Sequence, residues 1–217
     1  MNKQISIDEV KNHIKSGMTV MVGGFLGVGT PEKLIDVLIE NNIHDITLIC
    51  NDTAFPEIGS GRLITKKLVK KAIVSHIGTN PETGQQMIAR ETEIELVPQG
   101  SLAEKIRCGG VGLGGVLTKT GVATLVEQGK ETITINGEKY ILETPLHADV
   151  ALIYASKSDE KGNLVYNGST RNFNPIMAMA ADTVIVQADE IVPVGEITPE
   201  NIVTPHIVID YIVKKGE

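Results

Sequence analysis

The chain of 217 residues has no tryptophan, only 3% aromatic residues and only two cysteines. Its core must therefore be built from Val, Ile, Leu, Ala and Met, which is typical of a parallel or mixed sheet between helices. Cys50 and Cys108 lie in unlike contexts without a CxxC pair or a partner histidine spacing. Neither a disulfide framework nor a metal site is indicated, and we expect a reduced, cytoplasmic protein.

A surplus of basic residues is also missing, since the net charge is −7. Nucleic-acid backbones are bound by excess Lys and Arg, so we expect no nucleic-acid partner. No uncharged run reaches the ~18 residues needed to cross a bilayer, and the N-terminus lacks an apolar signal region. We therefore expect no membrane association. The length suits one α/β domain over residues 1–217.

A glycine-rich turn follows the first apolar segment, Met18–Val22, and leads into a helix that Pro31 starts. Its four glycines are Gly23, Gly24, Gly27 and Gly29. Such a turn lets backbone N–H groups approach a ligand, and the helix adds partial positive charge. It is not a P-loop, because Thr30-Pro31 replace Lys-Ser/Thr, and Glu32 replaces the third glycine of a dinucleotide fingerprint. An ordinary strand-to-helix turn is the alternative interpretation.

The rest of the chain alternates predicted strands and helices. Strands are expected at 46–50, 71–76, 94–97, 150–154 and 184–187, with a hairpin at 133–142 turning at Asn136-Gly137. Helices are expected from a capping box at 6–9 that Gly17 closes, at 32–42, from a second capping box at 101–104, and near Pro175. Residues 206–213 fit a strand or a helix. The stretch 109–115, with a GxGxxG spacing that follows no strand, predicts a mobile or ligand-covering loop.

This pattern predicts an α/β fold with an open, mostly parallel sheet flanked by helices and an inserted β-hairpin. Parallel strands end at one edge of such a sheet, where ligands bind. The glycine turn and Asn51-Asp52 both follow strands. We therefore expect Gly23, Gly24 and Asn51-Asp52 to point at one crevice.

Motifs from end to end of the chain resemble the alpha subunit of the family I 3-oxoacid coenzyme A transferases, of the acetate/butyrate–acetoacetate type. They are Val22-Gly-Gly-Phe-Leu-Gly-Val-Gly-Thr-Pro31, Asn51-Asp52, Gly78-Thr-Asn-Pro81, Glu95-Leu-Val-Pro-Gln-Gly100, Arg107-Cys-Gly-Gly110 and Arg171-Asn-Phe-Asn-Pro175. Ser16-Gly17 departs from the family's Asp/Asn-Gly at a turn. The resemblance implies the CoA-transferase-like fold and a coenzyme A thioester as substrate, with no permanently bound cofactor.

The resemblance also implies a ping-pong reaction in which a glutamate of the beta subunit is the nucleophile. The family's Ser-Glu-Asn-Gly motif is absent here, so we expect a beta-subunit partner in an α2β2 assembly, with acyl-CoA and short carboxylic acids as substrates. Gln99 corresponds to the family's oxyanion donor. The acyl pocket would be formed by the remaining candidates, Gly23, Gly24, Phe25, Gly27, Gly29, Asn51, Asp52, Gly78 and Asn80.

Simpler interpretations exist for several of these residues. Gln99 would otherwise satisfy a loop carbonyl, and Phe25 would be core. An acidic Asp52 beside an anionic substrate is awkward unless it faces away or is hydrogen-bonded. His76 follows a strand and so could approach the crevice, although a lone histidine is more often structural than a base. Cys108 has no partner that would activate its thiol.

The lysines at 66, 67, 70 and 71 would form a solvated face, with contact to CoA phosphates as the alternative. Two other functions remain open. A sugar-phosphate isomerase of similar fold would be active alone, with acid and base in the same chain. A ligand-sensing regulator domain is disfavoured by the acidic charge and by the lack of a DNA-binding extension.

Overall fold

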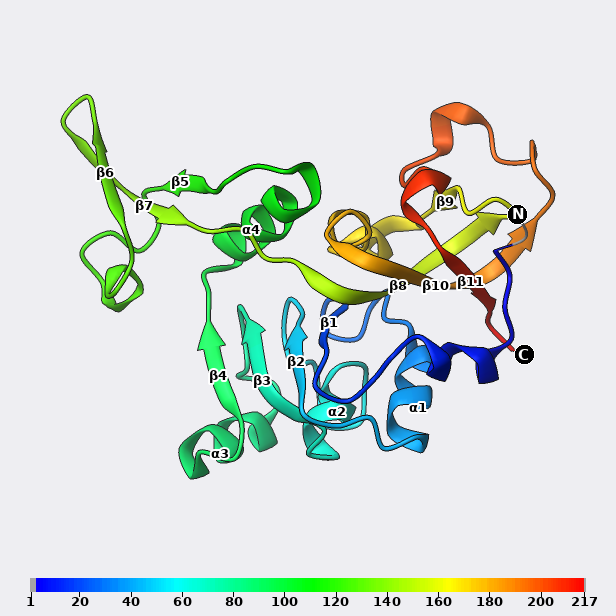
Figure 1. The fold of residues 1–217 in the computed structure, drawn as a ribbon, viewed down its shortest axis with the longest axis horizontal. Coiled ribbons are helices and arrows are strands. Elements are labelled where there is room, and N and C mark those ends of the chain that lie inside the picture. The colour runs from blue at the N-terminus through cyan, green and yellow to red at the C-terminus, as the bar shows by residue number, and fades with distance from the viewer. Residues whose placement is uncertain (1–2, 217) are drawn as a thin grey trace.

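An eight-stranded sheet forms the centre of the computed structural model, which describes residues 3–216 (Figure 1). Its strand order is β11-β10-β8-β1-β2-β3-β4, and β9 pairs with β8 outside this path. Every pairing along the path is parallel, and only the β8–β9 pairing is antiparallel. The strands are β1 Thr19–Val22, β2 Ile46–Ile49, β3 Val69–Val74, β4 Glu93–Leu96, β8 Ala148–Asp159, β9 Leu164–Val165, β10 Ala181–Val192 and β11 Tyr211–Lys214.

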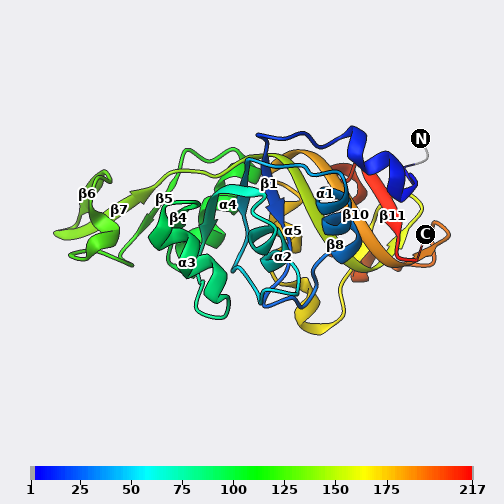
Figure 2. The same cartoon turned by 90° about the horizontal axis from the view of Figure 1, so that it is seen from below.

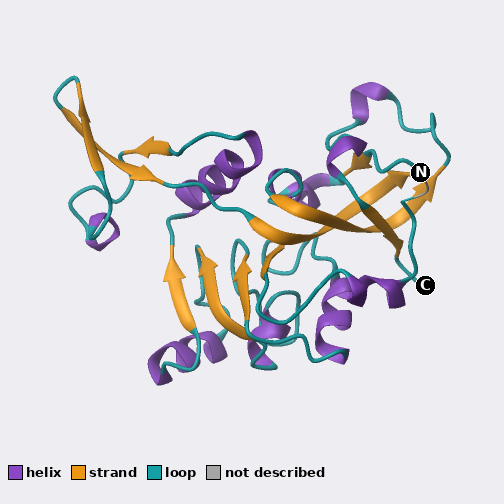
Figure 3. Ribbon diagram, in the orientation of Figure 1, coloured by secondary structure: helices purple, strands orange, loops and turns teal. Residues whose placement is uncertain are grey.

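Helices lie on both sides of this sheet (Figure 3). The α-helices are α1 Glu32–Glu40, α2 Gly61–Thr65, α3 Pro81–Ala89, α4 Gln99–Val111 and α5 Asn174–Met177. The 3-10 helices are η1 Ile7–Asn12, η2 Leu125–Glu127, η3 Gly168–Arg171, η4 Pro199–Asn201 and η5 His206–Val208. Within the described residues, no helix is long and apolar enough to cross a membrane.

The two-residue period of the strands divides the core into two clusters. Val20 and Leu48 face one side and pack with η1, α1 and α2. Met21 and Ile49, one residue further along the same strands, face the other side and pack with α4 and α5. Because both faces are covered, the central strands β1 and β2 are apolar at all but one position each, as expected for a parallel sheet.

A separate three-stranded antiparallel sheet has the order β5-β7-β6 and lies at one end of the elongated molecule (Figure 2). Its strands are β5 Val116–Thr118, β6 Thr132–Ile135 and β7 Glu138–Glu143. Asn136 (φ +52°) and Gly137 (φ +80°) form the predicted two-residue turn between β6 and β7. At the base of this sheet the buried Glu143 carboxylate pairs with Lys105 of α4 at 3.2 Å and with Lys130 at 2.6 Å.

The predicted fold class is confirmed, including the parallel β1–α1–β2 unit, in which Val20 pairs with Leu48. The ambiguous segment 206–213 contains both alternatives, since η5 precedes strand β11. The predicted helix at 6–9 exists as the 3-10 helix η1, in which the Glu9 carboxylate accepts hydrogen bonds from the backbone and hydroxyl of Ser6. Gly17 does not close it, because η1 ends at Asn12 and Gly17 lies in the following turn.

Two expectations around α4 were wrong. Ser101 and Glu104 do not form a capping box, because α4 begins two residues earlier, at Gln99, and Glu104 pairs with Arg107 instead. The glycines that predicted a long loop are partly helical, since Gly109 and Gly110 form the last turns of α4. A Cβ atom on Gly109 would lie 2.0 Å from the backbone oxygen of Leu146, so glycine here permits close packing of the helix rather than loop mobility.

Candidate active site

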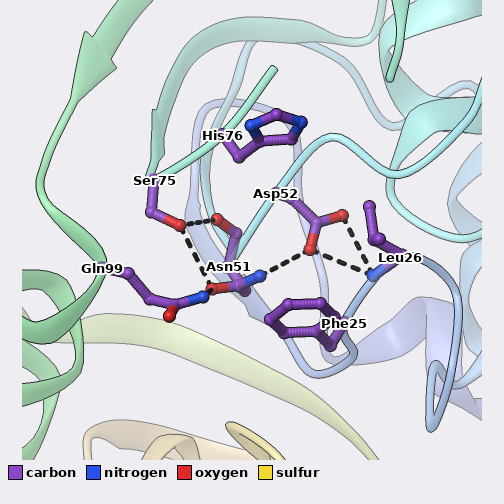
Figure 4. A pocket seen from close by; sticks show the side chains of 7 residues that line it. All are labelled: Phe25, Leu26, Asn51, Asp52, Ser75, His76 and Gln99. Atoms are coloured by element: carbon purple, nitrogen blue, oxygen red, sulfur yellow. Dashed lines mark hydrogen bonds between the residues drawn. The ribbon is translucent and has the colours of Figure 1, made fainter. Parts of the chain in front are cut away.

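A cavity of about 380 Å³ lies at the edge of the main sheet where β2 and β3 end and α4 begins (Figure 4). Its lining side chains are Phe25, Leu26, Asn51, Asp52, Ser75, His76 and Gln99. The structure thus brings together four of the candidates from the sequence, Phe25, Asn51, Asp52 and Gln99. This edge is the one at which open parallel sheets bind ligands.

Two side-chain amides form the polar wall of this cavity. Gln99, at the first position of α4, donates from Nε2 to Asn51 Oδ1 at 2.9 Å. Asn51, directly after β2, donates from Nδ2 to Asp52 Oδ2 at 2.6 Å. The Ser75 hydroxyl lies 2.7 Å from the Asn51 backbone oxygen and 3.2 Å from its Oδ1, and donates to both. The Gln99 NH2 group has two hydrogens, of which one is used in this chain, so the other is available to a ligand.

The buried Asp52 carboxylate is held by donors of this chain on both oxygens. The backbone N–H of Leu26 lies 3.0 and 3.2 Å from the two oxygens, and the N–H of Ala54 lies 2.7 Å from Oδ1. With the Asn51 amide, these bonds join the turns after β1 and β2. Asp52 therefore organises the cavity wall rather than acting as a free nucleophile, and the expected conflict with an anionic substrate is reduced because its charge is stabilised internally.

The glycine turn contributes less backbone to the cavity than the sequence suggested. The N–H groups of residues 23–26 are all bonded within the chain, to Leu152 O, Asn172 Oδ1, Val28 O and Asp52 respectively. The prediction that these N–H groups bind a ligand was therefore wrong at these positions. Two of these partners, Leu152 of β8 and Asn172 before α5, lie far away in the sequence.

Close packing explains why these positions are glycine. A Cβ atom on Gly23 would lie 1.8 Å from Asn174 Oδ1, and one on Gly29 would lie 2.5 Å from Thr170 O. Gly24 and Gly27 likewise lie against neighbouring side chains. None of these four glycines lines the cavity, whereas Phe25, between them, is 41% exposed and is not a core residue.

Two further candidates lie outside the cavity. Asn80 is fully buried, where its Oδ1 accepts from Glu82 N at the start of α3 and its Nδ2 donates to Thr53 O at 3.0 Å. Its side chain is thus committed to holding α3, and it does not reach the cavity. Gly78 lies against the His76 ring, since a Cβ there would be 2.9 Å from Cε1.

Sequence reasoning did not single out Ser75, whose hydroxyl bonds to Asn51 in this wall. Ser75 follows β3, so the strand-end argument that selected Asn51 would also have found it. For His76 the sequence left open an approach to the crevice beside a structural role, and its ring does line the cavity (Figure 4).

Lysine and cysteine side chains do not take part in the cavity. Among the described residues, neither a Lys nor an Arg lines it. Lys67 bonds to Glu91 at 2.8 Å, which raises the lysine pKa, and Lys71 bonds to Glu93 and Glu95 at 2.9 Å. Cys108 is buried in α4, and burial raises the pKa of the Cys50 thiol. Within the described part of the chain, no group of three His, Cys, Asp or Glu is placed to hold a metal ion.

Comparisons with known proteins identify the family of this chain. The family model described as coenzyme A transferase matches residues 3–215, and the chain belongs to this family. It is 54% identical over 215 residues to the acetate CoA-transferase subunit alpha of Escherichia coli K12, covering 99% of this chain and 98% of that one. It is also 54% identical over 214 residues to the acetoacetyl-CoA:acetate/butyrate CoA transferase alpha subunit of Clostridium acetobutylicum, covering 99% and 98% respectively. The family resemblance predicted from the motifs is thus confirmed.

Solved structures show the same fold at low sequence identity. An acyl-CoA transferase of E. coli O157:H7, in a thioester complex with CoA, matches 98% of this chain with a TM-score of 0.88 and 19% identity. Glutaconate coenzyme A-transferase from Acidaminococcus fermentans matches 98% of this chain and 75% of its own, with a TM-score of 0.85 and 20% identity. This chain spans about half the length of the first of these, 49%.

Proposed function

We propose that this chain is the alpha subunit of a hetero-oligomeric CoA-transferase that moves CoA between a short-chain acyl-CoA or 3-oxoacyl-CoA and a carboxylic acid. Acetate, acetoacetate and butyrate are the proposed acids, because two relatives at 54% identity carry these names and match the chain over nearly their whole length. CoA thioesters are substrates in this proposal, and no permanently bound cofactor is required.

The linked amides of Gln99 and Asn51 are the observation that carries the proposal. Attack on a thioester puts negative charge on the carbonyl oxygen, and a preorganised N–H donor in a sheltered cavity stabilises that charge by about 3 kcal/mol. The second hydrogen of the Gln99 amide is available for this bond. The first hydrogen, bonded to Asn51, fixes the direction in which the second one points.

A nucleophile must come from another chain. Among the described residues, Asp52 is the one carboxylate on the cavity wall, and both of its oxygens already accept hydrogen bonds. In the proposed reaction a beta-subunit glutamate attacks the thioester carbonyl and expels CoA thiolate, which leaves an acyl anhydride. The thiolate then attacks the glutamyl carbonyl of the anhydride and releases the acid, and a second acid reverses both steps.

We propose an α2β2 assembly that works in the cytoplasm. The subunit naming of the relatives supports the hetero-oligomer, and the two free, buried cysteines suit a reducing compartment.

The test is reconstitution. The chain and its beta subunit, co-expressed and purified, are expected to transfer CoA from acetoacetyl-CoA to acetate, and native mass measurement is expected to give two copies of each. Either subunit alone is expected to be inactive. Transfer by this chain alone, or sugar-phosphate isomerisation by it, would refute the proposal, because transfer needs a nucleophile, and isomerisation an acid and a base, in this one chain.

A further inference from the structure

Two short turns of similar sequence follow the neighbouring strands β1 and β2. Phe25-Leu-Gly-Val-Gly-Thr30 and Phe55-Pro-Glu-Ile-Gly-Ser60 share a Phe, a β-branched residue three positions later, then Gly and a hydroxyl residue. Each turn closes on itself, since Val28 N donates to Phe25 O at 2.9 Å and Ile58 N donates to Phe55 O at 3.1 Å. The same turn is therefore built twice, on adjacent strands of the sheet.

The two turns pack side by side into one surface. A Cβ atom on Gly27 would lie 2.3 Å from Ile58 Cγ2, so the Ile58 methyl group lies directly over the first turn. The backbone of the second turn is equally close, since a Cβ on Gly59 would lie 3.6 Å from Gly27 Cα. Four side chains form this surface, which we term the paired-turn patch: Phe25 (41% exposed), Val28 (46%), Phe55 (40%) and Ile58 (43%).

The paired-turn patch borders the candidate active site. Phe25 lines the candidate active-site cavity, which we term the amide cavity after Asn51 and Gln99. Phe25 also lines a second cavity of about 380 Å³, whose other lining residues are Val28, Ser169 and Asn172. Singly exposed apolar residues are common on protein surfaces and need no explanation. The paired-turn patch does need an explanation, because it joins four half-exposed apolar side chains and one of them, Phe25, lies at the mouth of a cavity that lacks a nucleophile.

We propose that the paired-turn patch is the docking surface of the beta subunit and that the second cavity receives an apolar side chain of that subunit. This inference rests on the proposed function. A nucleophile attacks from about 3–3.5 Å, so the subunit that carries it must cover the mouth of the amide cavity. Phe25 is part of that mouth, and the rest of the patch continues outward from it. The covering chain therefore contacts the patch.

The chemistry of the patch fits a protein surface better than the other ligands of this enzyme. Interface energy is concentrated in apolar and aromatic anchors that enter desolvated pockets beside a polar rim. The phosphates of CoA require donors or cations, and the one charged residue within the two turns, Glu57, is acidic. Covering Phe25 would also exclude water from the thioester, which favours transfer over hydrolysis.

The first experiment compares assembly of single variants with the beta subunit. Ile58→Asp and Val28→Asp each put a charge on the patch, whereas Ile88→Asp on α3 and Ile207→Asp on η5 are controls at sites 81% and 80% exposed. Loss of a central interface anchor corresponds to a dissociation constant at least about 30-fold higher. The patch variants are expected to show that increase by native mass spectrometry or ultracentrifugation, and the controls to stay within about threefold of wild type.

The second experiment does not disturb the fold. Cys50 and Cys108 are buried, so a Val28→Cys variant presents one accessible thiol, and Ile88→Cys is its matched control. The thiol at position 28 is expected to react quickly with a maleimide in the free chain and at least about tenfold more slowly in the complex. The thiol at position 88 is expected to react equally fast in both.

The outcomes separate this inference from the proposed function. If the wild-type chain and the beta subunit do not associate, both are refuted. If they associate but Ile58→Asp and Val28→Asp assemble as well as the controls, or the thiol at position 28 is not protected, this inference alone is refuted. Unchanged assembly of Val28→Asp together with an altered acyl-chain preference would show that the second cavity holds substrate instead.

Discussion

Replacing Gln99 by Ala is the sharpest test of the candidate site. If the amide donates to the oxyanion, its loss lowers kcat of the complete enzyme by about 10²–10³, which is 2.7–4 kcal/mol, with little change in KM. If Gln99 only positions Asn51, its loss removes one hydrogen bond, worth about 0.5–1.5 kcal/mol or at most about tenfold. Ser75 and Asp52 would still hold Asn51 in that case.

Gln99→Glu sharpens this comparison, because it keeps the shape of the side chain and replaces the NH2 donor by an anionic oxygen. That oxygen would face both Asn51 Oδ1 and the developing oxyanion, so the loss is expected to exceed that of Gln99→Ala. Gln85→Ala, on the exposed side of α3, is the matched control and is expected to keep full activity. Steady-state kinetics of CoA transfer measures all three, and a Gln99→Ala enzyme within about tenfold of wild type refutes the oxyanion role.

Three further predictions concern stability, measured by denaturant unfolding. Glu143→Ala leaves its lysine partners uncompensated at a buried site, so it is expected to cost about 3–5 kcal/mol; a loss under 1 kcal/mol would contradict this. Burial alone would raise the Asp159 pKa, but hydrogen bonds from Asn163 and nearby backbone N–H groups outweigh burial and hold this pKa below its usual range. A carboxyl group with a lowered pKa contributes its full stability above the unfolded-state pKa of about 3.9, and this contribution is lost as the pH falls below that value. Asp159→Asn should therefore lose less stability than wild type on acidification. Equal losses would refute this. Gly29→Ala is expected to destabilise the protein by more than about 1 kcal/mol, because Gly29 has φ +67° and the backbone oxygen of Thr170 lies 2.5 Å from its Cβ position. Gly84→Ala in α3, with open space around it, is expected to stabilise the protein by about 0.5–1 kcal/mol. The reverse order would refute the packing argument.

The fold class could be predicted from the sequence, because it depends on local periodicity. The strand order could not be predicted. The parallel β1–α1–β2 unit and the Asn136-Gly137 hairpin follow from patterns within a few residues of each other. The errors at α4 arose where longer-range packing prevailed. Position 109 is glycine because the Leu146 backbone packs against α4 there, and the sequence around residue 109 carries no sign of that contact.

The site was predictable to the extent that it depends on strand ends and on the family resemblance. Asn51 and Gln99 were selected on those grounds. In the structure their side chains are hydrogen-bonded, with Gln99 Nε2 2.9 Å from Asn51 Oδ1. The partners of the glycine-turn N–H groups were not predictable, since Asn172 is 148 residues from Gly24. Local sequence shows that a backbone donor exists, but only the tertiary structure shows whether that donor is already used.

The position of Gln99 at the start of α4 ties the candidate site to a helix end, where local opening is easiest. The first turn is closed by the hydrogen bond from Leu102 N to Pro98 O at 2.8 Å, and opening it releases the amide from Asn51. With Gln99 as oxyanion donor, the rate of CoA transfer would scale with the fraction of molecules in which this turn is closed, because only those molecules hold the amide in place. If Gln99 is the oxyanion donor, a turn that is open a tenth of the time lowers the rate by only about a tenth, so considerable fraying at this helix end is compatible with turnover.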